Sequence, residues 1–194
     1  MVFTNSDYTK LRKEVEQRGL LIQTPFYYLL VFVVNLLLLA LLYWLVLYLK
    51  SWYVVLLLAV PIAAVHMQFA YIGHDAGHNA TSRKTYINNS IGYFCHSFLL
   101  GGSFAYWKYK HNEHHTHPNH ENLDPDLKRD PFAFSENKAK KRHGLSRILT
   151  RYQAFIVPFT LSIVLFLMRI DSFKYMWKRK KEVIADLILI VSHV

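Results

Sequence analysis

The chain has 194 residues, of which 53% are hydrophobic and 15% are aromatic, and its formal net charge is +10. Such a charge is compatible with nucleic-acid binding, but the basic residues flank long apolar blocks, where they set membrane topology and attract anionic lipid headgroups. We therefore exclude nucleic acid as a partner. The single cysteine, Cys95, excludes an internal disulfide and argues against a thiolate metal site, so we interpret it as a small buried side chain.

The polar lead over residues 1–25 is predicted to lie on the cytoplasmic side. Its apolar spacing indicates a short amphipathic helix on the membrane surface, which Gly19 would end. Lys and Arg are frequent in this lead and again over residues 74–151, and scarce in the short connection between the first two apolar blocks. The positive-inside rule therefore places both segments in the cytoplasm.

The two apolar blocks that follow the lead predict membrane spans. Residues 26–49 and 52–72 contain no charged residue, and each block exceeds the roughly 20 residues that a helix needs to cross a bilayer. Backbone groups in lipid must bond internally, so both blocks are expected to be helices. Only Lys50 and Ser51 separate them. The sequence predicts a transmembrane helical hairpin over 26–73, retained rather than cleaved as a signal peptide.

The segment 74–151 is predicted to be a cytoplasmic histidine-box region with an interfacial or re-entrant segment over 86–106. It contains most of the 11 histidines of the protein. Five of them form an HxxxH box and an HxxHH box on two expected helices: His74, His78, His111, His114 and His115. The second of these helices should begin near Tyr106 and end before Pro118.

Residues 152–194 are predicted to hold a third span and a truncated fourth span. The third apolar block covers about residues 152–168. The positive-inside rule would place the basic run over 169–181 outside the cytoplasm if this block were a full span, which conflicts with its charge. The apolar block therefore either spans the membrane, with the rule locally overridden, or dips into the membrane and returns. The fourth apolar block is still apolar at Val194. We expect the chain to be the N-terminal portion of a longer protein with one domain. The predicted fold class is an all-α integral membrane protein: helical hairpins with a cytoplasmic histidine-rich helical cap.

The spacing of the box histidines predicts a metal centre. Positions i, i+3 and i+4 share one face of an α-helix, so each box would present its imidazoles together. Neutral imidazole suits iron, zinc, copper or nickel, and five ligands are too many for one tetrahedral zinc. Two metal ions are therefore expected. A zinc-protease HExxH motif is absent from the sequence.

Other polar residues near the boxes are candidates for supporting roles. Metal-bound histidines usually donate their second N–H to an acceptor. Residues that could accept this hydrogen bond, or could equally be solvated or turn residues, are Asp75, Asn112, Asn119, Asp124 and Asp126. His117 and His120 lie beyond the box helix and could contact the metal, but hydrogen bonding within the loop is favoured. We interpret His66, His143 and His193 as structural, and we favour no ligand role for His96.

Residues 71–78 resemble the first histidine box of the membrane fatty acid desaturases, and residues 107–115 resemble the second. The downstream Pro118-Asn119 and the run 123–126, Leu-Asp-Pro-Asp, extend the second resemblance. The similarity covers residues 60–130. It implies a non-haem di-iron centre of two iron ions held almost wholly by histidines, which inserts a double bond into an acyl-chain lipid with dioxygen and two electrons.

The resemblance also implies what lies outside these boxes. The family has a third QxxHH box after the fourth span, which is not reached here, so the chain alone is expected to be inactive. The lead lacks a His-Pro-Gly-Gly haem motif, which implies a separate donor: a ferredoxin, or a b-type cytochrome with its reductase. The short lead favours a bacterial inner membrane, with the endoplasmic reticulum as the site in a eukaryote.

Two alternatives stay open. The first is a related membrane di-iron hydroxylase or ketolase, or a sphingolipid desaturase, because ligand boxes do not separate desaturation from hydroxylation. The second is a non-catalytic histidine-rich membrane protein that binds metal or senses pH. The sequence does not specify the double-bond position, the acyl carrier (coenzyme A, carrier protein or lipid) or the oligomeric state.

Overall fold

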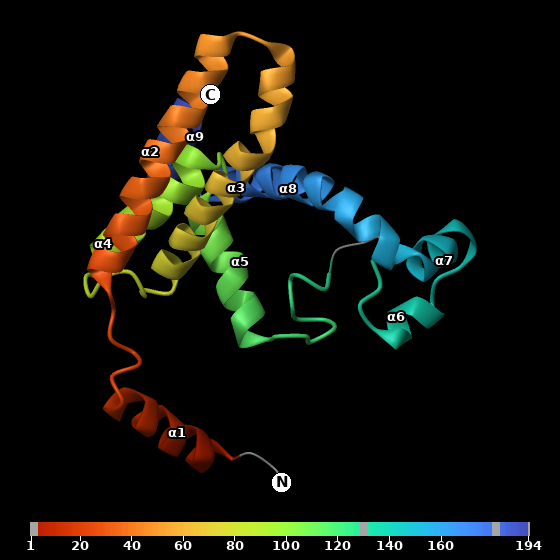
Figure 1. Cartoon of the computed structure of the whole chain (residues 1–194). Coiled ribbons are helices and arrows are strands. Elements are labelled where there is room, and N and C mark those ends of the chain that lie inside the picture. Colours follow the sequence, from red (N-terminus) through yellow and green to blue (C-terminus); the bar gives the residue numbers. More distant parts are fainter. Residues whose placement is uncertain (1–3, 129–131, 180–182, 194) are drawn as a thin grey trace. The chain divides into compact units, whose positions relative to one another are not determined.

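The computed structural model describes residues 4–128, 132–179 and 183–193, which form helices and connecting loops (Figure 1). The protein divides into two compact units, Met1–Ile91 and Gly92–Val194. The prediction of an all-α fold built around a helical hairpin is confirmed. The proposed division of the sequence into a lead, a hairpin, a histidine-box region and further spans stays a prediction.

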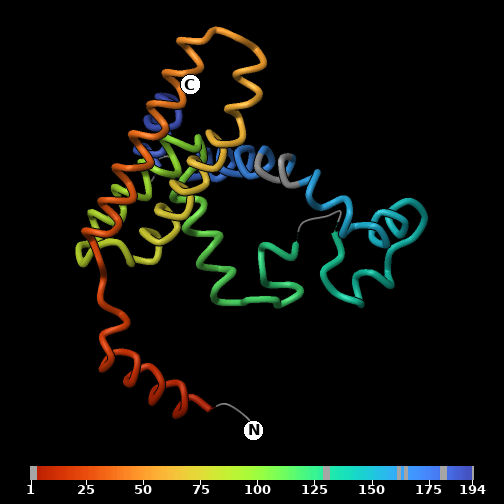
Figure 2. Tube along the Cα trace, viewed as in Figure 1, coloured from red at the N-terminus to blue at the C-terminus, as the bar shows by residue number. Residues whose placement is uncertain are grey.

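The first unit contains the predicted hairpin. Helix α1 (Asn5–Gln17) is followed by α2 (Pro25–Leu49) and α3 (Trp52–Gly77). Pro25 lies in the first turn of α2, where its missing N–H costs nothing. Lys50 ends α2 in the left-handed conformation, with a φ of 47°, so the backbone turns back and α3 packs along α2 (Figure 2).

The hairpin exposes most of its apolar side chains. Only Leu39 and Leu42 are buried on α2, while Phe26, Leu47 and Leu57 are among the many large apolar side chains that lie on the surface. Soluble proteins rarely expose an apolar patch larger than a few hundred Å². Among the described residues, α2 and α3 are the two helices long and apolar enough to cross a membrane. Lipid is the environment in which such a surface is stable.

Beyond the hairpin, a buried asparagine organises the loop that follows the first box. Helix α3 continues through the box to Gly77, and α4 (Thr85–Gly92) begins shortly afterwards. The Asn88 side chain is fully buried; its Oδ1 accepts hydrogen bonds from the Thr81 hydroxyl at 2.6 Å and the Ser82 amide at 3.0 Å. Its Nδ2 donates to the Ser82 carbonyl at 2.7 Å. These bonds fix the turn between α3 and α4.

The second unit carries the second box on α5 (Phe104–Thr116). The π-helix η1 (Tyr93–Leu99) precedes it, and α9 (Ile184–His193) packs against η1. Two short helices, α6 (Glu136–Lys140) and α7 (Gly144–Arg151), lead into α8 (Gln153–Lys178), which contacts α5. Helix α8 runs without a break past the apolar block that ends at 168. Whether this block, residues 152–168, spans the membrane or dips in and returns stays a prediction.

Gly92, at the junction of α4 and η1, allows Phe104 to pack against the backbone. A β-carbon on Gly92 would lie 2.1 Å from Phe104 Cζ, and the Phe104 ring is only 1% exposed. We expect Gly92→Ala to lower the free energy of unfolding by about 1–3 kcal/mol, because the ring has no space to retreat. The control is Gly102→Ala, whose β-carbon would meet nothing closer than the His96 carbonyl oxygen at 4.0 Å. Equal denaturation midpoints for the two variants would contradict this packing.

Cys95 is fully buried on η1, as the sequence predicts. Burial raises the pKa of its thiol to about 12, because the thiolate would lose its hydration. An ordinary thiol ionises near pH ~8.5, so Cys95 should stay neutral in mildly alkaline solution, where a free thiol reacts. We expect iodoacetamide to label Cys95 slowly in the folded protein and rapidly after denaturation, as followed by mass spectrometry. Rapid labelling before unfolding would show that the thiol is accessible.

Candidate metal centre

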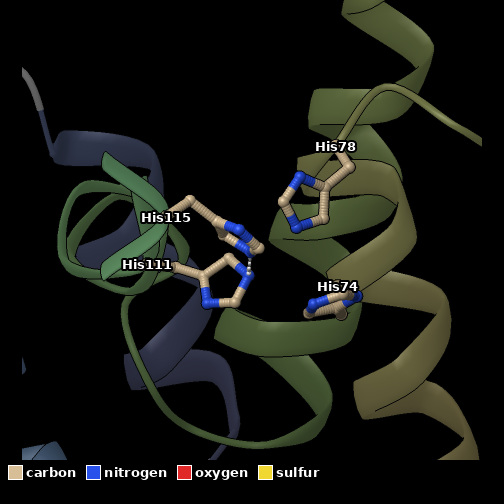
Figure 3. Close-up of side chains that lie close together, drawn as sticks. All are labelled: His74, His78, His111 and His115. Atoms are coloured by element: carbon tan, nitrogen blue, oxygen red, sulfur yellow. Dashed lines mark hydrogen bonds between the residues drawn. The ribbon is translucent and has the colours of Figure 1, made fainter. Parts of the chain in front are cut away.

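The first histidine box lies at the C-terminal end of α3. His74 is on its last turn, His78 caps the helix, and their ring centroids are 4.7 Å apart (Figure 3). His74 Nδ1 lies 3.1 Å from a carboxylate oxygen of Asp75, and the Tyr28 hydroxyl donates to the other oxygen at 2.9 Å. A carboxylate accepts, so the Nδ1 of His74 carries the proton and its Nε2 is the atom suited to a metal.

The second histidine box lies at the C-terminal end of α5. The Nε2 atoms of His111 and His115 are 3.0 Å apart, at positions i and i+4 of the helix (Figure 3). Two imidazole nitrogens bound at right angles to one metal ion at ~2.1 Å, as in octahedral coordination, are about 3.0 Å from each other. The spacing of this pair therefore fits shared ligation, and the helix itself produces it.

His114 is held by a buried carboxylate. Its Nδ1 lies 3.0 Å from each oxygen of Asp124, whose side chain is fully buried. Asp124 also accepts hydrogen bonds from the backbone amides of Asn119 and Asp126, both at 2.9 Å. These contacts fix the His114 ring with its Nε2 directed away from the carboxylate, as in the histidines of many metal sites.

The charge state of Asp124 follows from these contacts. Burial by itself raises the pKa of the carboxyl group, but the hydrogen bonds from His114 and from the Asp126 and Asn119 amides outweigh burial and lower the pKa below its usual value. The carboxylate is thus favoured over the protonated acid. Its negative charge would increase the basicity of a metal-bound imidazole at His114.

The remaining predicted site residues lie around the second box. Asp126 is 3.5 Å from His114 Nδ1 and forms an ion pair with Lys110. Asn119 contributes its backbone amide to Asp124 from a left-handed conformation, with a φ of 61°, while Asn112 is exposed on α5. His120 Nδ1 accepts from the Asn122 and Leu123 amides at 3.3 and 3.2 Å. His117 lies beside it, with ring centroids 6.5 Å apart.

The structure also places the histidines that were assigned no ligand role. His66 Nδ1 bonds to the Ile62 carbonyl oxygen at 2.9 Å within α3, and His193 Nδ1 bonds to the Phe98 carbonyl oxygen at 2.7 Å. His143 is exposed and precedes α7. The ring of His96 stacks on Trp107, with centroids 4.6 Å apart.

Sequence reasoning missed two aromatic residues that touch the boxes. The Tyr28 hydroxyl reaches Asp75 from α2, a contact between residues far apart in the sequence. Trp107 stacks on His111 with ring centroids 4.6 Å apart and an interplanar angle of 18°. The i, i+4 spacing of Trp107 and His111 could have revealed this second contact, because such pairs share a helix face.

The donor atoms of both boxes fit a transition metal. Each box offers imidazole nitrogens at helical spacing, and in each one histidine has its second nitrogen hydrogen-bonded to a carboxylate. Iron(II), like zinc and copper, accepts such ligands. Either box could therefore contribute ligands to a redox-active metal.

Comparison with known families shows which family carries these histidine boxes. The model of the fatty acid desaturase family matches residues 50–194. This chain belongs to the fatty acid desaturase family. The family assignment confirms the resemblance in the histidine boxes and the assignment to the desaturase oxidoreductases.

Curated relatives of this desaturase-family protein are named as fatty-acid and sphingolipid desaturases. The Delta(8)-fatty-acid desaturase of Helianthus annuus is 37% identical over 134 residues, 68% of this chain and 29% of the relative. The Delta(8)-fatty-acid desaturase of Euglena gracilis is 29% identical over 77% of this chain and 35% of its own length. The Delta 8-(E)-sphingolipid desaturase of Komagataella phaffii is 40% identical over 45% of this chain and 16% of its own length.

The chain thus spans at most 35% of the length of these relatives. No solved structure matches it.

Proposed function

We propose that this protein is an acyl-lipid desaturase that inserts a carbon–carbon double bond with dioxygen and two electrons. The observation that carries the proposal is the pair of His111 and His115, whose Nε2 atoms are 3.0 Å apart in a protein of the desaturase family. The C–H bonds in the middle of an acyl tail offer no acid or base group for a side chain to act on. Bound iron would supply the oxidising power that the reaction requires.

The proposed ligands of two iron ions are the five box histidines: His74, His78, His111, His114 and His115. Asp75 and Asp124 would orient His74 and His114, since each accepts a hydrogen bond from the Nδ1 of its histidine. Tyr28 would hold Asp75 in turn. These contacts leave the Nε2 atoms for the metal and fix the rings before the metal binds, so little reorganisation is needed.

The proposed substrate is the acyl tail of a membrane lipid. The relatives are named as fatty-acid, acyl-lipid and sphingolipid desaturases, and the exposed apolar surface of α2 and α3 fits a protein embedded in lipid. The acyl or base portion of a sphingolipid is the second candidate, favoured by the relative from Komagataella phaffii. The electrons would come from a protein donor, a ferredoxin or a b-type cytochrome with its reductase.

We propose that the protein crosses the membrane several times and that its histidine boxes lie on the cytoplasmic side. The two apolar helices suggest membrane insertion. The relatives named above come from a plant, a protist and a yeast, which favours the endoplasmic reticulum over the bacterial inner membrane that the short lead suggested. Chemical labelling of cysteines placed in the loop after α5 would test the sidedness.

Product analysis tests the proposed reaction. The protein encoded by the complete gene is expressed in a host supplied with a defined lipid substrate, and its products are analysed by mass spectrometry. Loss of two hydrogen atoms, dependent on oxygen and on reductant, is expected. Gain of one oxygen atom would instead identify a hydroxylase on the same scaffold. Stoichiometric zinc with no product would favour a non-catalytic metal-binding protein.

A further inference from the structure

A buried carboxylate connects the last apolar helix to the start of the second-box helix. Asp186 is 0% exposed although it lies in α9, whose other residues are mainly aliphatic. A buried carboxylate costs several kcal/mol unless hydrogen bonds replace its lost hydration. The position of Asp186 therefore requires nearby donors, and the structure supplies them from η1 and α5.

Four groups donate to the Asp186 carboxylate. The Ser97 hydroxyl and the Phe104 amide donate to Oδ1, the latter at 2.9 Å. The Ser103 hydroxyl donates to Oδ2 at 2.7 Å, and the Ala105 amide at 3.2 Å. The Phe104 and Ala105 amides belong to the first turn of α5, whose amides lack partners within the helix. Asp186 thus accepts hydrogen bonds from the free amides of the first turn of α5, and a carboxylate is favoured at the positive end of the helix dipole.

The end of α5 that Asp186 holds is linked to the second box by stacked rings. The Phe104 ring lies 5.9 Å from the Trp107 ring at an interplanar angle of 13°. Trp107 in turn stacks on His111, with centroids 4.6 Å apart. Phe104 is almost fully buried, so a shift of its backbone would displace Trp107 and His111 with it.

Two further hydrogen bonds hold the turn between η1 and α5. The Nδ1 of His193, on α9, donates to the Phe98 carbonyl at 2.7 Å, and Arg169, on α8, donates to the Leu100 carbonyl at 2.8 Å. Both carbonyls lie at the C-terminal end of η1, just before Gly101, whose φ is 65°. The turn between η1 and α5 is therefore held by residues from α8 and α9.

We propose that Asp186 is a positioning residue for the second histidine box. It sets the start of α5 and, through Phe104 and Trp107, the orientation of the His111 ring. The inference rests on the proposed metal-binding function of the box and extends it. It assigns to α9 a role in preparing the metal site, although α9 contributes no proposed ligand.

The test measures Co²⁺ binding. Asp186→Ala and Asp186→Asn are made in the full-length protein with every proposed ligand left in place, and the protein without these substitutions is the background protein. We expect Asp186→Ala to weaken Co²⁺ binding at least about 10-fold, as loss of a supporting residue in a metal site does. The visible Co²⁺ spectrum should change as well, because the His111 ring is reoriented.

Asp186→Asn should lie between Asp186→Ala and the background protein. Its amide oxygen can still accept from the Phe104 amide, but its NH₂ group would face the Ala105 N–H, which would lose its acceptor. The matched control is Asp171→Asn on α8, a partly exposed carboxylate 3.6 Å from Lys174 Nζ, and it should leave Co²⁺ binding unchanged. Hydrogen exchange of the Phe104 and Ala105 amides should accelerate in Asp186→Ala, and that of the Ala105 amide in Asp186→Asn.

Three results would overturn the proposal, and they are distinguishable. Background affinity and spectrum in both Asp186 variants would show that α9 does not act on the box. Loss of exchange protection throughout α5, α8 and α9 in both variants would show a general structural role. Failure of the background protein itself to bind Co²⁺ would contradict the proposed metal-binding function, and the inference would fall with it.

Discussion

Replacing His111 with alanine in the protein from the complete gene is expected to reduce desaturated product at least about 100-fold, beyond the 10–100-fold that loss of a supporting residue typically costs. The substitution removes one nitrogen of the His111–His115 pair, whose Nε2 atoms lie 3.0 Å apart. It also removes the ring that stacks on Trp107. Product and iron content should fall together, as measured by gas chromatography and elemental analysis of the purified protein.

The matched control for this substitution is His143→Ala. His143 is exposed and lies directly before α7, away from both boxes in the sequence. Product and iron content should stay at the level of the unmodified protein. An active, iron-loaded His111→Ala protein would remove His111 from the proposed ligands.

Replacing Asp124 with alanine is expected to weaken iron binding by about 10–100-fold while leaving all five proposed ligands in place. The carboxylate holds the Nδ1 of His114 at 3.0 Å and accepts two backbone amides of the same turn at 2.9 Å. Without it, the His114 ring can rotate and the amides of Asn119 and Asp126 lose their acceptor. Iron affinity is measured by competition with a chelator.

Acid should produce a similar effect in the unmodified protein. The pKa of Asp124 is lowered in the folded state, so its carboxylate contributes stability above the unfolded pKa, and that contribution is lost as the pH falls through the folded value.

Asp126→Ala is the comparison for Asp124→Ala, because Asp126 lies 3.5 Å from the Nδ1 of His114 and is half exposed. Equal losses in Asp124→Ala and Asp126→Ala would contradict a specific role for Asp124.

The hairpin and both box helices could be predicted because local patterns determine them. Two uncharged blocks separated by Lys50 and Ser51 require two helices and a tight turn, and these are present. The spacing of His111 and His115 brings their rings together on any α-helix. Helix α5 begins at Phe104, close to the predicted start near Tyr106, because Ser103 caps it.

The contacts that support the boxes could be predicted only in part. Asp124 was a candidate because Asp-Pro-Asp follows the box closely, and the turn through Asn119 returns it to His114. Tyr28 and Asp186 gave no signal, since their partners lie on distant segments. A charged residue in an apolar helix such as α9 is nevertheless a reason to look for buried donors.

Helix α8 shows what charge patterns do not specify. The basic residues after 168 bear on whether the preceding block spans the membrane, which stays a prediction, while the helix itself continues to Lys178. Lys and Arg have high helix propensity, so a basic run does not end a helix by itself. Topology rules count charges and do not report where a helix stops.

Mössbauer spectroscopy of the protein from the complete gene, purified in lipid nanodiscs and loaded with ⁵⁷Fe, tests the central claim most directly. If the box histidines hold a di-iron centre, the spectrum will show two iron ions per protein in a coupled, nitrogen-rich site. Asp124→Ala and His111→Ala would deplete that signal. A single uncoupled iron, or zinc in place of iron, would contradict the account.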